Sequence, residues 1–303
     1  MSTLALKVDV DTHRGMRDGV PRLADILAAR RIPATFFISM GPDNSGRAVL
    51  RFFTRRGFLK KMFRSNAVGM YGIRTALSGT ILPSRQIARP FPRHFRRLLN
   101  AGHEVGIHGH DHVRWHDRIP RMGMEETRAE FEAARAVFRE IVGREPESSA
   151  APGWACSPRQ LEVQDSTGMR YHSDSRGAGP FFPVMDGYRA AHLQVPTTLP
   201  TLDELMGSGA CRGAEELERF YLERIAAEGT HVLAVHAEAE GMGWAGWFDG
   251  LLSGLALRRV RFLRLCDVAA EALATPGAAP RCLLEMSEIP GRAGSVACRG
   301  PAA

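Results

Sequence analysis

The chain has 303 residues, of which 44% are hydrophobic, so it can bury a full core and is not disordered throughout. Its five cysteines contain no CxxC pair, which argues against a disulfide framework and a cysteine zinc site and favours a reducing compartment. The net charge of +7 is regional, because residues 44–103 hold thirteen Lys or Arg and no Asp or Glu, and we therefore expect an anionic partner that meets one basic patch.

The beginning of the chain predicts a strand, a helix and a second strand. Residues 4–10 (LALKVDV) alternate like a strand, residues 19–31 match a helix with Pro21 in its first turn, and residues 34–39 (ATFFIS) match a buried strand. The helical residues expected to face inward are Leu23, Ile26 and Leu27. The first residues have neither the apolar core nor the small-residue cleavage site of a signal peptide, which favours a cytoplasmic protein.

Helices and strands continue to alternate along the chain. The expected elements are helix 92–101, strand 103–108, helix 124–142, short strands near 148–151 and 170–173, helix 214–228, strand 230–236, and a strand and helix within 260–274. This order predicts an α/β fold on a parallel sheet, closed or open, with active groups at the carboxyl ends of the strands. The polar residues at or just after such ends are Asp9, Asp11, His108, Asp174 and His236.

Residues 47–89 interrupt the alternation with an insertion too long for a simple connection, which suggests a function. Residues 47–56 and 58–64 each match a basic amphipathic helix suited to a membrane interface, although an ordinary surface hairpin packed on the core is the alternative. Residues 67–83 are apolar but carry Arg74 and are too short to span a bilayer, so we expect no transmembrane helix. The candidates for membrane insertion are Phe52, Phe53, Phe58, Met62 and Phe63.

The last part of the chain changes in composition. Residues 275–303 are rich in Gly, Pro and Ala without periodicity. We expect one domain over residues 1–274, which includes the insertion, followed by a flexible C-terminal tail.

Two short motifs carry metal-binding chemistry. His108 and His112 are four residues apart, and with one carboxylate they make a three-ligand set that leaves positions for water and substrate on an ion. Asp9 and Asp11 point to the same side of a strand, so one can bind the ion while the other deprotonates water. The alternatives are a turn pair for the two Asp, and a surface or core role for the His pair.

The motifs VDVDT, HGHDH, YHSDSRG and LAVHAE resemble those of the polysaccharide deacetylase superfamily, also called the NodB homology or carbohydrate esterase family 4 fold. The runs RGMRDGVPRL, SMGPDNSGR, MFRSNA, DSRGAGPF, QVPTTLPTLDE and HAEAEG are similar to the branch that removes formate from 4-deoxy-4-formamido-L-arabinose carried on undecaprenyl phosphate. The resemblance covers residues 4–274. It implies a distorted (β/α) barrel and a hydrolase of carbon–nitrogen bonds. It also implies a step in lipid A modification that gives resistance to polymyxin and cationic peptides.

The resemblance also implies roles for individual residues. It makes Asp9 the general base and His236 the general acid, with Asp174 orienting that His. The implied metal ligands are Asp11, His108 and His112, and the ion is zinc, cobalt, manganese, iron or nickel. The segment SSAAPGWACS lacks the Arg that often contacts the base in this superfamily. We expect either that Arg176 replaces it or that Arg176 contacts the surface or a substrate phosphate.

The expected partners are the lipid-linked sugar and the anionic surface of the inner membrane, which the protein meets from the cytoplasmic side without nucleic acid. The candidates for substrate binding are Asn44, Ser65, Asn66, Trp154, Arg176 and Glu238. One alternative is a soluble N-acetylglucosamine deacetylase acting on chitin oligomers or peptidoglycan. Another is a non-catalytic protein that binds lipid or nucleic acid through the basic segment, which would hold no stoichiometric metal. The oligomeric state is open.

Overall fold

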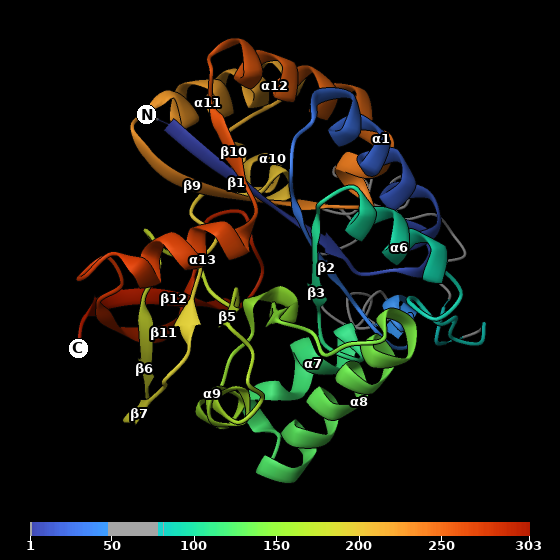
Figure 1. The fold of residues 1–303 in the computed structure, drawn as a ribbon, viewed down its shortest axis with the longest axis vertical. Helices are drawn as coiled ribbons and strands as arrows, with labels where there is room; N and C mark the ends of the chain where they lie inside the picture. The colour runs from blue at the N-terminus through green and yellow to red at the C-terminus, as the bar shows by residue number, and fades with distance from the viewer. Residues whose placement is uncertain (1, 48–77, 81) are drawn as a thin grey trace.

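A curled parallel β-sheet forms the centre of the molecule, as the alternation of strands and helices predicts (Figure 1). The computed structural model describes residues 2–47, 78–80 and 82–303. Among them the strand order of the sheet is β10-β1-β2-β3-β4-β5-β8, and an eighth strand, β9, also pairs with β1. Every pair in this sheet is parallel, so the carboxyl ends of the strands lie along one edge.

Each expected helix and strand is present with bounds close to the expected ones, and the structure adds helices 112–118, 158–165, 202–208 and 245–257 and strand 193–194, which the sequence analysis did not predict. The strands of the large sheet are β1 (Ser2–Val10), β2 (Thr35–Ile38), β3 (Glu104–Ile107), β4 (Ser148–Ser149), β5 (Tyr171–His172), β8 (Leu193–Gln194), β9 (Gly229–His236) and β10 (Arg261–Leu263). The α-helices are α1 (Val20–Arg30), α6 (Pro92–Asn100), α7 (His112–Arg118), α8 (Met124–Val142), α9 (Pro158–Asp165), α10 (Leu202–Ser208), α11 (Ala214–Ala226), α12 (Ala245–Leu257) and α13 (Leu265–Ala274). The predicted α/β fold is therefore confirmed.

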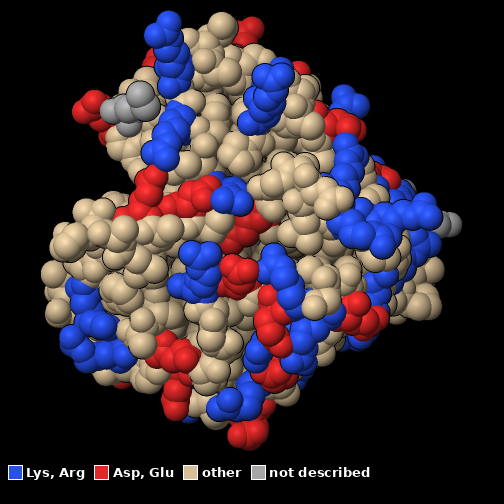
Figure 2. Space-filling model, in the orientation of Figure 1, with Lys and Arg blue, Asp and Glu red and all other residues tan. Residues whose placement is uncertain are grey.

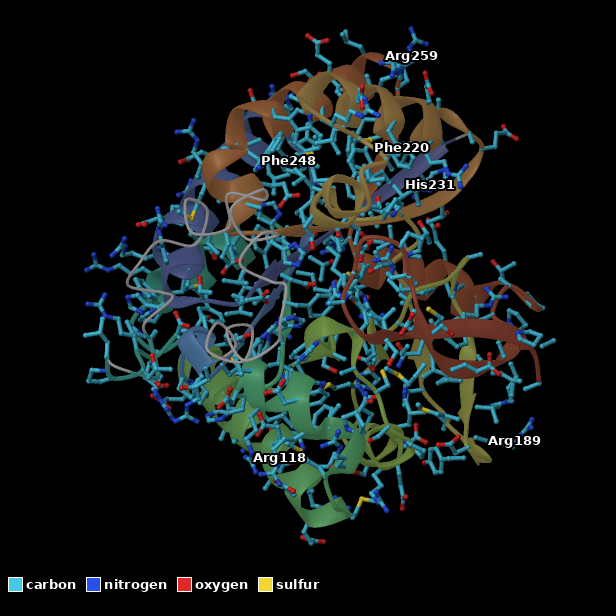
Figure 3. All side chains as sticks on the ribbon, turned by 180° about the vertical axis from the view of Figure 1, so that it is seen from behind. Arg118, Arg189, Phe220, His231, Phe248 and Arg259 are labelled. Atoms are coloured by element: carbon cyan, nitrogen blue, oxygen red, sulfur yellow. The ribbon has the colours of Figure 1, made fainter. Side chains whose placement is uncertain are left out.

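The helices bury one side against the sheet and expose the other. In α1 the expected inward residues Leu23, Ile26 and Leu27 are all buried, and Pro21 stands in the first turn. Helices α11 and α12 pack together at one end of the molecule, and α7, α8 and α9 gather at the other (Figure 1). Seen from behind, Phe248 lies within the α12 layer, whereas Arg189 and Arg259 lie at the outer edge (Figure 3).

Residues 275–303 do not form a flexible tail, and that expectation is wrong. They form β11 (Arg281–Glu288) and β12 (Ser295–Ala302), an antiparallel pair. β11 also pairs in parallel with β6 (Phe182–Met185), which pairs with β7 (Tyr188–Arg189). Burial of alternate side chains on β11 and of the first residues of β12 holds this hairpin in place: Cys282, Leu284, Val296 and Ala297 are buried. The folded unit thus extends to Ala302.

The expected membrane-binding segment falls mostly outside the described residues. Residues 48–77 and 81 are not described, so the two amphipathic helices stay predictions. No helix in the described ranges is long and apolar enough to cross a membrane.

Candidate active site

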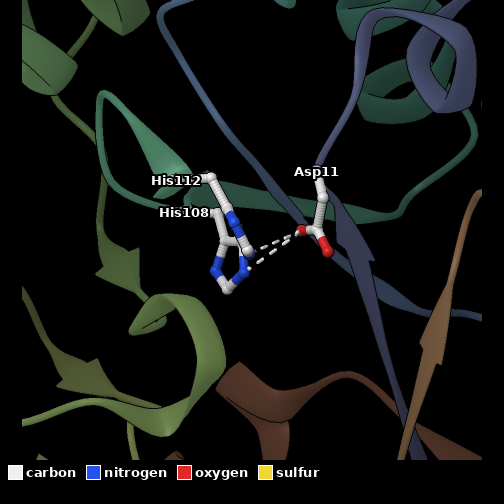
Figure 4. A group of neighbouring side chains, drawn as sticks. All are labelled: Asp11, His108 and His112. Atoms are coloured by element: carbon white, nitrogen blue, oxygen red, sulfur yellow. Dashed lines mark ion pairs between the residues drawn. The ribbon is translucent and has the colours of Figure 1, made fainter. Parts of the chain in front are cut away.

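Three potential metal ligands from separate elements meet at the carboxyl edge of the sheet. Asp11 follows β1, His108 follows β3, and His112 is the first residue of α7. Asp11 Oδ1 lies 3.4 Å from His108 Nε2 and 3.5 Å from His112 Nε2 (Figure 4). One ligand atom of each residue lies within 4.8 Å of the others. The structure therefore brings together the three residues that the sequence analysis singled out as ligands.

The protonation and hydrogen bonding of this group fit a divalent cation. His108 Nδ1 is 2.9 Å from Ala150 O, so Nδ1 carries the hydrogen and Nε2 faces Asp11 with a lone pair. Burial lowers the pKa of His108 well below its usual range and that of His112 to about 4, so both rings are neutral near pH 7. Asp11 Oδ1 is buried without a hydrogen bond, and burial raises the pKa of Asp11 to about 6. A bound cation would relieve both penalties.

The loop that carries His112 is held by a network of polar side chains. Asp111 caps α7 by accepting a hydrogen bond from Arg114 N at 3.0 Å. Asn44 Nδ2 donates to Asp111 Oδ2 at 2.7 Å, and Asn44 Oδ1 accepts from Ser84 Oγ. Both ends of the Asn44 amide are thus engaged within the protein. Asn44 positions the metal-ligand loop, and the structure does not support the expected contact with the sugar.

Asp9 lies on β1 beside the three potential ligands and pairs with a lysine on the same strand. Lys7 Nζ is 3.2 Å from Asp9 Oδ2 and donates to Ser173 O at 3.2 Å. Asp9 Oδ1 is buried and has no hydrogen-bond partner within the described ranges. Asp9 Oδ2 therefore pairs with the Lys7 ammonium, and Asp9 Oδ1 is free to accept a proton.

His236 ends β9 directly opposite Asp9. The two residues are register partners across the parallel β1–β9 pair, and Ala237 N donates to Asp9 O at 3.0 Å. Burial alone would lower the pKa of His236. Nearby carboxylates outweigh burial and raise that pKa to about 9, chiefly Asp11, Asp203 and Glu240. In the metal-free protein His236 is therefore a protonated imidazolium near pH 7.

Comparison with known proteins identifies the family of this site. The family model described as polysaccharide deacetylase matches residues 2–172, more than half of the chain. The chain belongs to the polysaccharide deacetylase family. As a member of this family it is a hydrolase acting on carbon–nitrogen bonds, as predicted from the sequence.

Similar proteins extend the likeness of this polysaccharide deacetylase to almost the whole chain. A protein of Shewanella sediminis named probable 4-deoxy-4-formamido-L-arabinose-phosphoundecaprenol deformylase ArnD is 33% identical over 88% of this chain and 86% of its own. A protein of the same name from Wigglesworthia glossinidia brevipalpis is 30% identical over 93% of this chain and 97% of its own. The crystal structure of a Mycobacterium smegmatis protein classed as a polysaccharide deacetylase is 18% identical, has a TM-score of 0.63, and covers 95% of this chain and 96% of its own. This last likeness shows the fold, which is the expected distorted (β/α) barrel.

Asp174 does not orient His236 in this polysaccharide deacetylase, and that expectation is wrong. Its carboxylate is fully buried, and Oδ2 accepts hydrogen bonds from the side-chain amides of Gln160, Gln164 and Gln194. The neighbouring Ser173 O accepts from Lys7. The segment around Asp174 therefore supports the Lys7–Asp9 pair. The sequence around Asp174 carries no signal that distinguishes orienting His236 from supporting the Lys7–Asp9 pair, because the distinction depends on how the strands are placed in the fold.

Arg176 is not the partner of Asp9 either. Its Nη1 lies 2.8 and 2.9 Å from the two oxygens of Glu204, and its Nη2 donates to Leu199 O at 2.9 Å. The guanidinium stacks on the Trp154 ring, with Cζ 4.9 Å from the centroid. Arg176 is buried in these contacts, and the indole N–H of Trp154 donates to Thr197 Oγ1. Neither group is therefore available for the expected contact with the substrate.

Glu238 braces the turn after β1 from the inside. Its Oε1 accepts hydrogen bonds from Asp11 N at 3.0 Å, Thr12 N at 2.8 Å and Thr12 Oγ1 at 2.8 Å. A Cβ on Gly15 would lie 2.0 Å from this oxygen, so a glycine is needed there. Glu238 thus positions the Asp11 main chain, which contradicts its assignment as a substrate contact. The other candidates, Ser65 and Asn66, lie outside the described residues.

Proposed function

We propose that this chain is a metal-dependent deformylase that hydrolyses the formamide of 4-deoxy-4-formamido-L-arabinose carried on undecaprenyl phosphate, and releases formate and the 4-amino sugar. The observation that carries the proposal is the register of Asp9 with His236, beside the Asp11, His108 and His112 cluster. Relatives that bear the name of this activity match nearly the full chain. The product would serve lipid A modification and resistance to polymyxin.

The three clustered side chains would hold the ion. Bound by Asp11, His108 and His112, a divalent metal supplies a Lewis acid that polarises the formamide carbonyl and acidifies water. The donor set of one carboxylate and two imidazoles accommodates zinc, cobalt, manganese, iron or nickel.

Asp9 and His236 divide the proton transfers. Asp9 Oδ1, which has no hydrogen bond among the described residues, takes a proton from the water that attacks the formamide carbon. Lys7 pairs with the other oxygen of the same carboxylate and holds it in place. His236, the register partner of Asp9, gives its proton to the nitrogen as the carbon–nitrogen bond breaks. The oxygen of the attacking water ends in formate, and the nitrogen stays on the sugar as a free amine.

A lipid-linked substrate requires the enzyme to reach the inner membrane from the cytoplasmic side. The described part of the basic region supports electrostatic attraction to an anionic membrane, because Arg93, Arg96 and Arg97 of α6 are exposed. Lys and Arg side chains gather on the side of the molecule where α6 lies (Figure 2). Each cation near an anionic leaflet contributes about 1 kcal/mol of attraction. We infer peripheral association through this face together with residues 47–89.

Comparing substrates tests the proposal. Purified protein supplied with a divalent metal should release formate from the formamido-arabinose lipid and should leave N-acetylglucosamine oligomers intact. The reverse preference would make the chain a soluble N-acetylglucosamine deacetylase. A protein that holds no metal and turns over neither substrate would instead match the non-catalytic alternative.

A further inference from the structure

The turn of the C-terminal hairpin is built to hold one arginine in place. Arg292 N donates to Ile289 O at 3.4 Å, with Pro290 and Gly291 between them. Gly291 has a φ of 82°, and proline followed by a left-handed glycine is the signature of a type II turn. A Cβ on Gly291 would lie 2.0 Å from Glu204 O, so the turn sits tightly on the backbone of α10.

The same hairpin packs against a tryptophan of the site. Val296 of the hairpin joins Trp154 and Ala234 in a buried cluster, with Ile289 at its border. Arg292 stacks on the Trp154 ring, with Cζ 4.5 Å from the centroid. Trp154 itself has a φ of 53°, a left-handed conformation that is costly for a bulky residue and is held by this packing. The position of Arg292 is therefore fixed from both sides.

The guanidinium of Arg292 nevertheless has unused hydrogen-bonding capacity. Its nearest carboxylate is Glu204, at 3.7 Å from Nη1 to Oε1, and both oxygens of Glu204 already bind Arg176. Within the described ranges no acceptor lies at hydrogen-bond distance from this guanidinium. The side chain is 18% exposed, so a ligand can reach it.

Arg292 also lies near the reacting residues, because it shares a tryptophan ring with Lys7. Lys7 Nζ is 5.1 Å from the centroid of the Trp154 ring on which Arg292 stacks. The same Nζ lies 3.2 Å from Asp9 Oδ2. A fixed cation with unused donors thus stands at one border of the reaction centre.

We propose that Arg292 is a substrate-binding residue that contacts the phosphate attached to the sugar, so that the C-terminal hairpin completes the substrate site. The inference rests on the proposed function. In that substrate the formamide and the phosphate are attached to opposite ends of one pyranose ring. A residue that contacts the phosphate must therefore lie at the border of the reaction centre, across the width of one sugar ring from the formamide. A planar guanidinium with free donors matches phosphate geometry.

A pair of substrates separates this contact from a structural role. The first is a geranyl phosphodiester of 4-formamido-arabinose, and the second is its uncharged methyl glycoside. Arg292→Ala should lower the ratio of kcat/KM for the charged over the uncharged substrate by about tenfold to a hundredfold, the range for a hydrogen bond to a charged group. Arg292→Lys should recover part of this ratio. The matched control is Arg299→Ala on the same hairpin, where the guanidinium donates to Gly179 O, and it should leave the ratio unchanged.

Binding without turnover covers the case in which the proposed function fails. If the wild-type protein hydrolyses neither substrate, the deformylase proposal falls, and affinity for the geranyl-phosphate-linked 4-amino sugar then tests Arg292. Weaker binding of this charged product by Arg292→Ala, with no matching loss for the uncharged amino glycoside, supports the phosphate contact. An unchanged ratio in turnover, or equal losses for the charged and uncharged products in binding, overturns it.

Discussion

Lys7 Nζ lies 3.2 Å from Asp9 Oδ2, and both side chains are almost completely buried. The two residues are two positions apart on β1 and point to the same side of the sheet. Aromatic rings surround the ammonium, with the Phe37 and Trp154 centroids at 5.8 and 5.1 Å. The cation that is missing from the segment SSAAPGWACS is therefore supplied by β1, the strand that carries Asp9.

Lys7→Met should destabilise the fold by about 3–5 kcal/mol, because it leaves the Asp9 carboxylate buried without its partner. Chemical denaturation measures the loss. The double variant Lys7→Met with Asp9→Asn removes both charges and should be more stable than Lys7→Met alone. Equal stability of the single and double variants would show that the loss in Lys7→Met does not come from the unpaired Asp9 carboxylate.

Asp203→Asn should lower the pKa of His236 from the value of about 9 set by its acidic neighbours. Titration of the His236 ring by NMR in metal-free protein measures this directly. A general acid works while protonated, so activity should fall as pH rises through its pKa, and the variant should lose activity at lower pH than the wild type. His236→Ala should reduce kcat by about 10²–10⁴-fold. A pKa for His236 that does not move in Asp203→Asn would contradict the electrostatic account.

His112→Ala should abolish stoichiometric metal binding and activity, since it removes one of three clustered ligands. Elemental analysis after dialysis measures the metal. The control is His231→Ala, which alters a histidine at the opposite end of β9 from His236 and should keep a full complement of ion (Figure 3). Retention of metal by His112→Ala would place the ion elsewhere.

Arg93→Ala with Arg96→Ala should weaken sedimentation with anionic vesicles by about tenfold or more, because each cation contributes about 1 kcal/mol. Added salt should reduce the difference, since it screens the attraction. Arg189→Ala with Arg259→Ala removes the same charge from exposed positions elsewhere and serves as the matched control. Equal losses in both double variants would mean that net charge, and not the α6 face, governs binding.

Local patterns predict most of the helices and strands and the three residues that cluster as potential metal ligands. The alternation in LALKVDV and the spacing of His108 and His112 are short-range signals, and strand ends of a parallel sheet meet at one edge. The signal for Lys7 was also local, because every second residue of a strand shares a side. A fully buried lysine is rare, so the alternation alone does not predict that Lys7 lies inside the protein.

Other parts of the site depend on contacts between distant segments. Asp203, Glu240 and Arg292 reach the site from α10, the turn after β9 and the hairpin, and no spacing in the sequence relates them to Asp11. The Gly and Pro residues around the hairpin obscure the alternation of buried residues at Cys282 and Leu284, so the composition predicts a tail where the structure has two strands. Long-range strand pairing with β6 decides the structure there.

Mass spectrometry of the polyprenyl-phosphate sugar tests the central claim most directly. Wild-type protein loaded with metal should convert the formamido lipid to a product lighter by the mass of one CO, with formate released in equal amount. Asp9→Asn should retain the metal and leave the lipid unchanged, because the proton acceptor is gone. An unchanged lipid with the metal-loaded wild type, or full conversion by Asp9→Asn, would contradict the account.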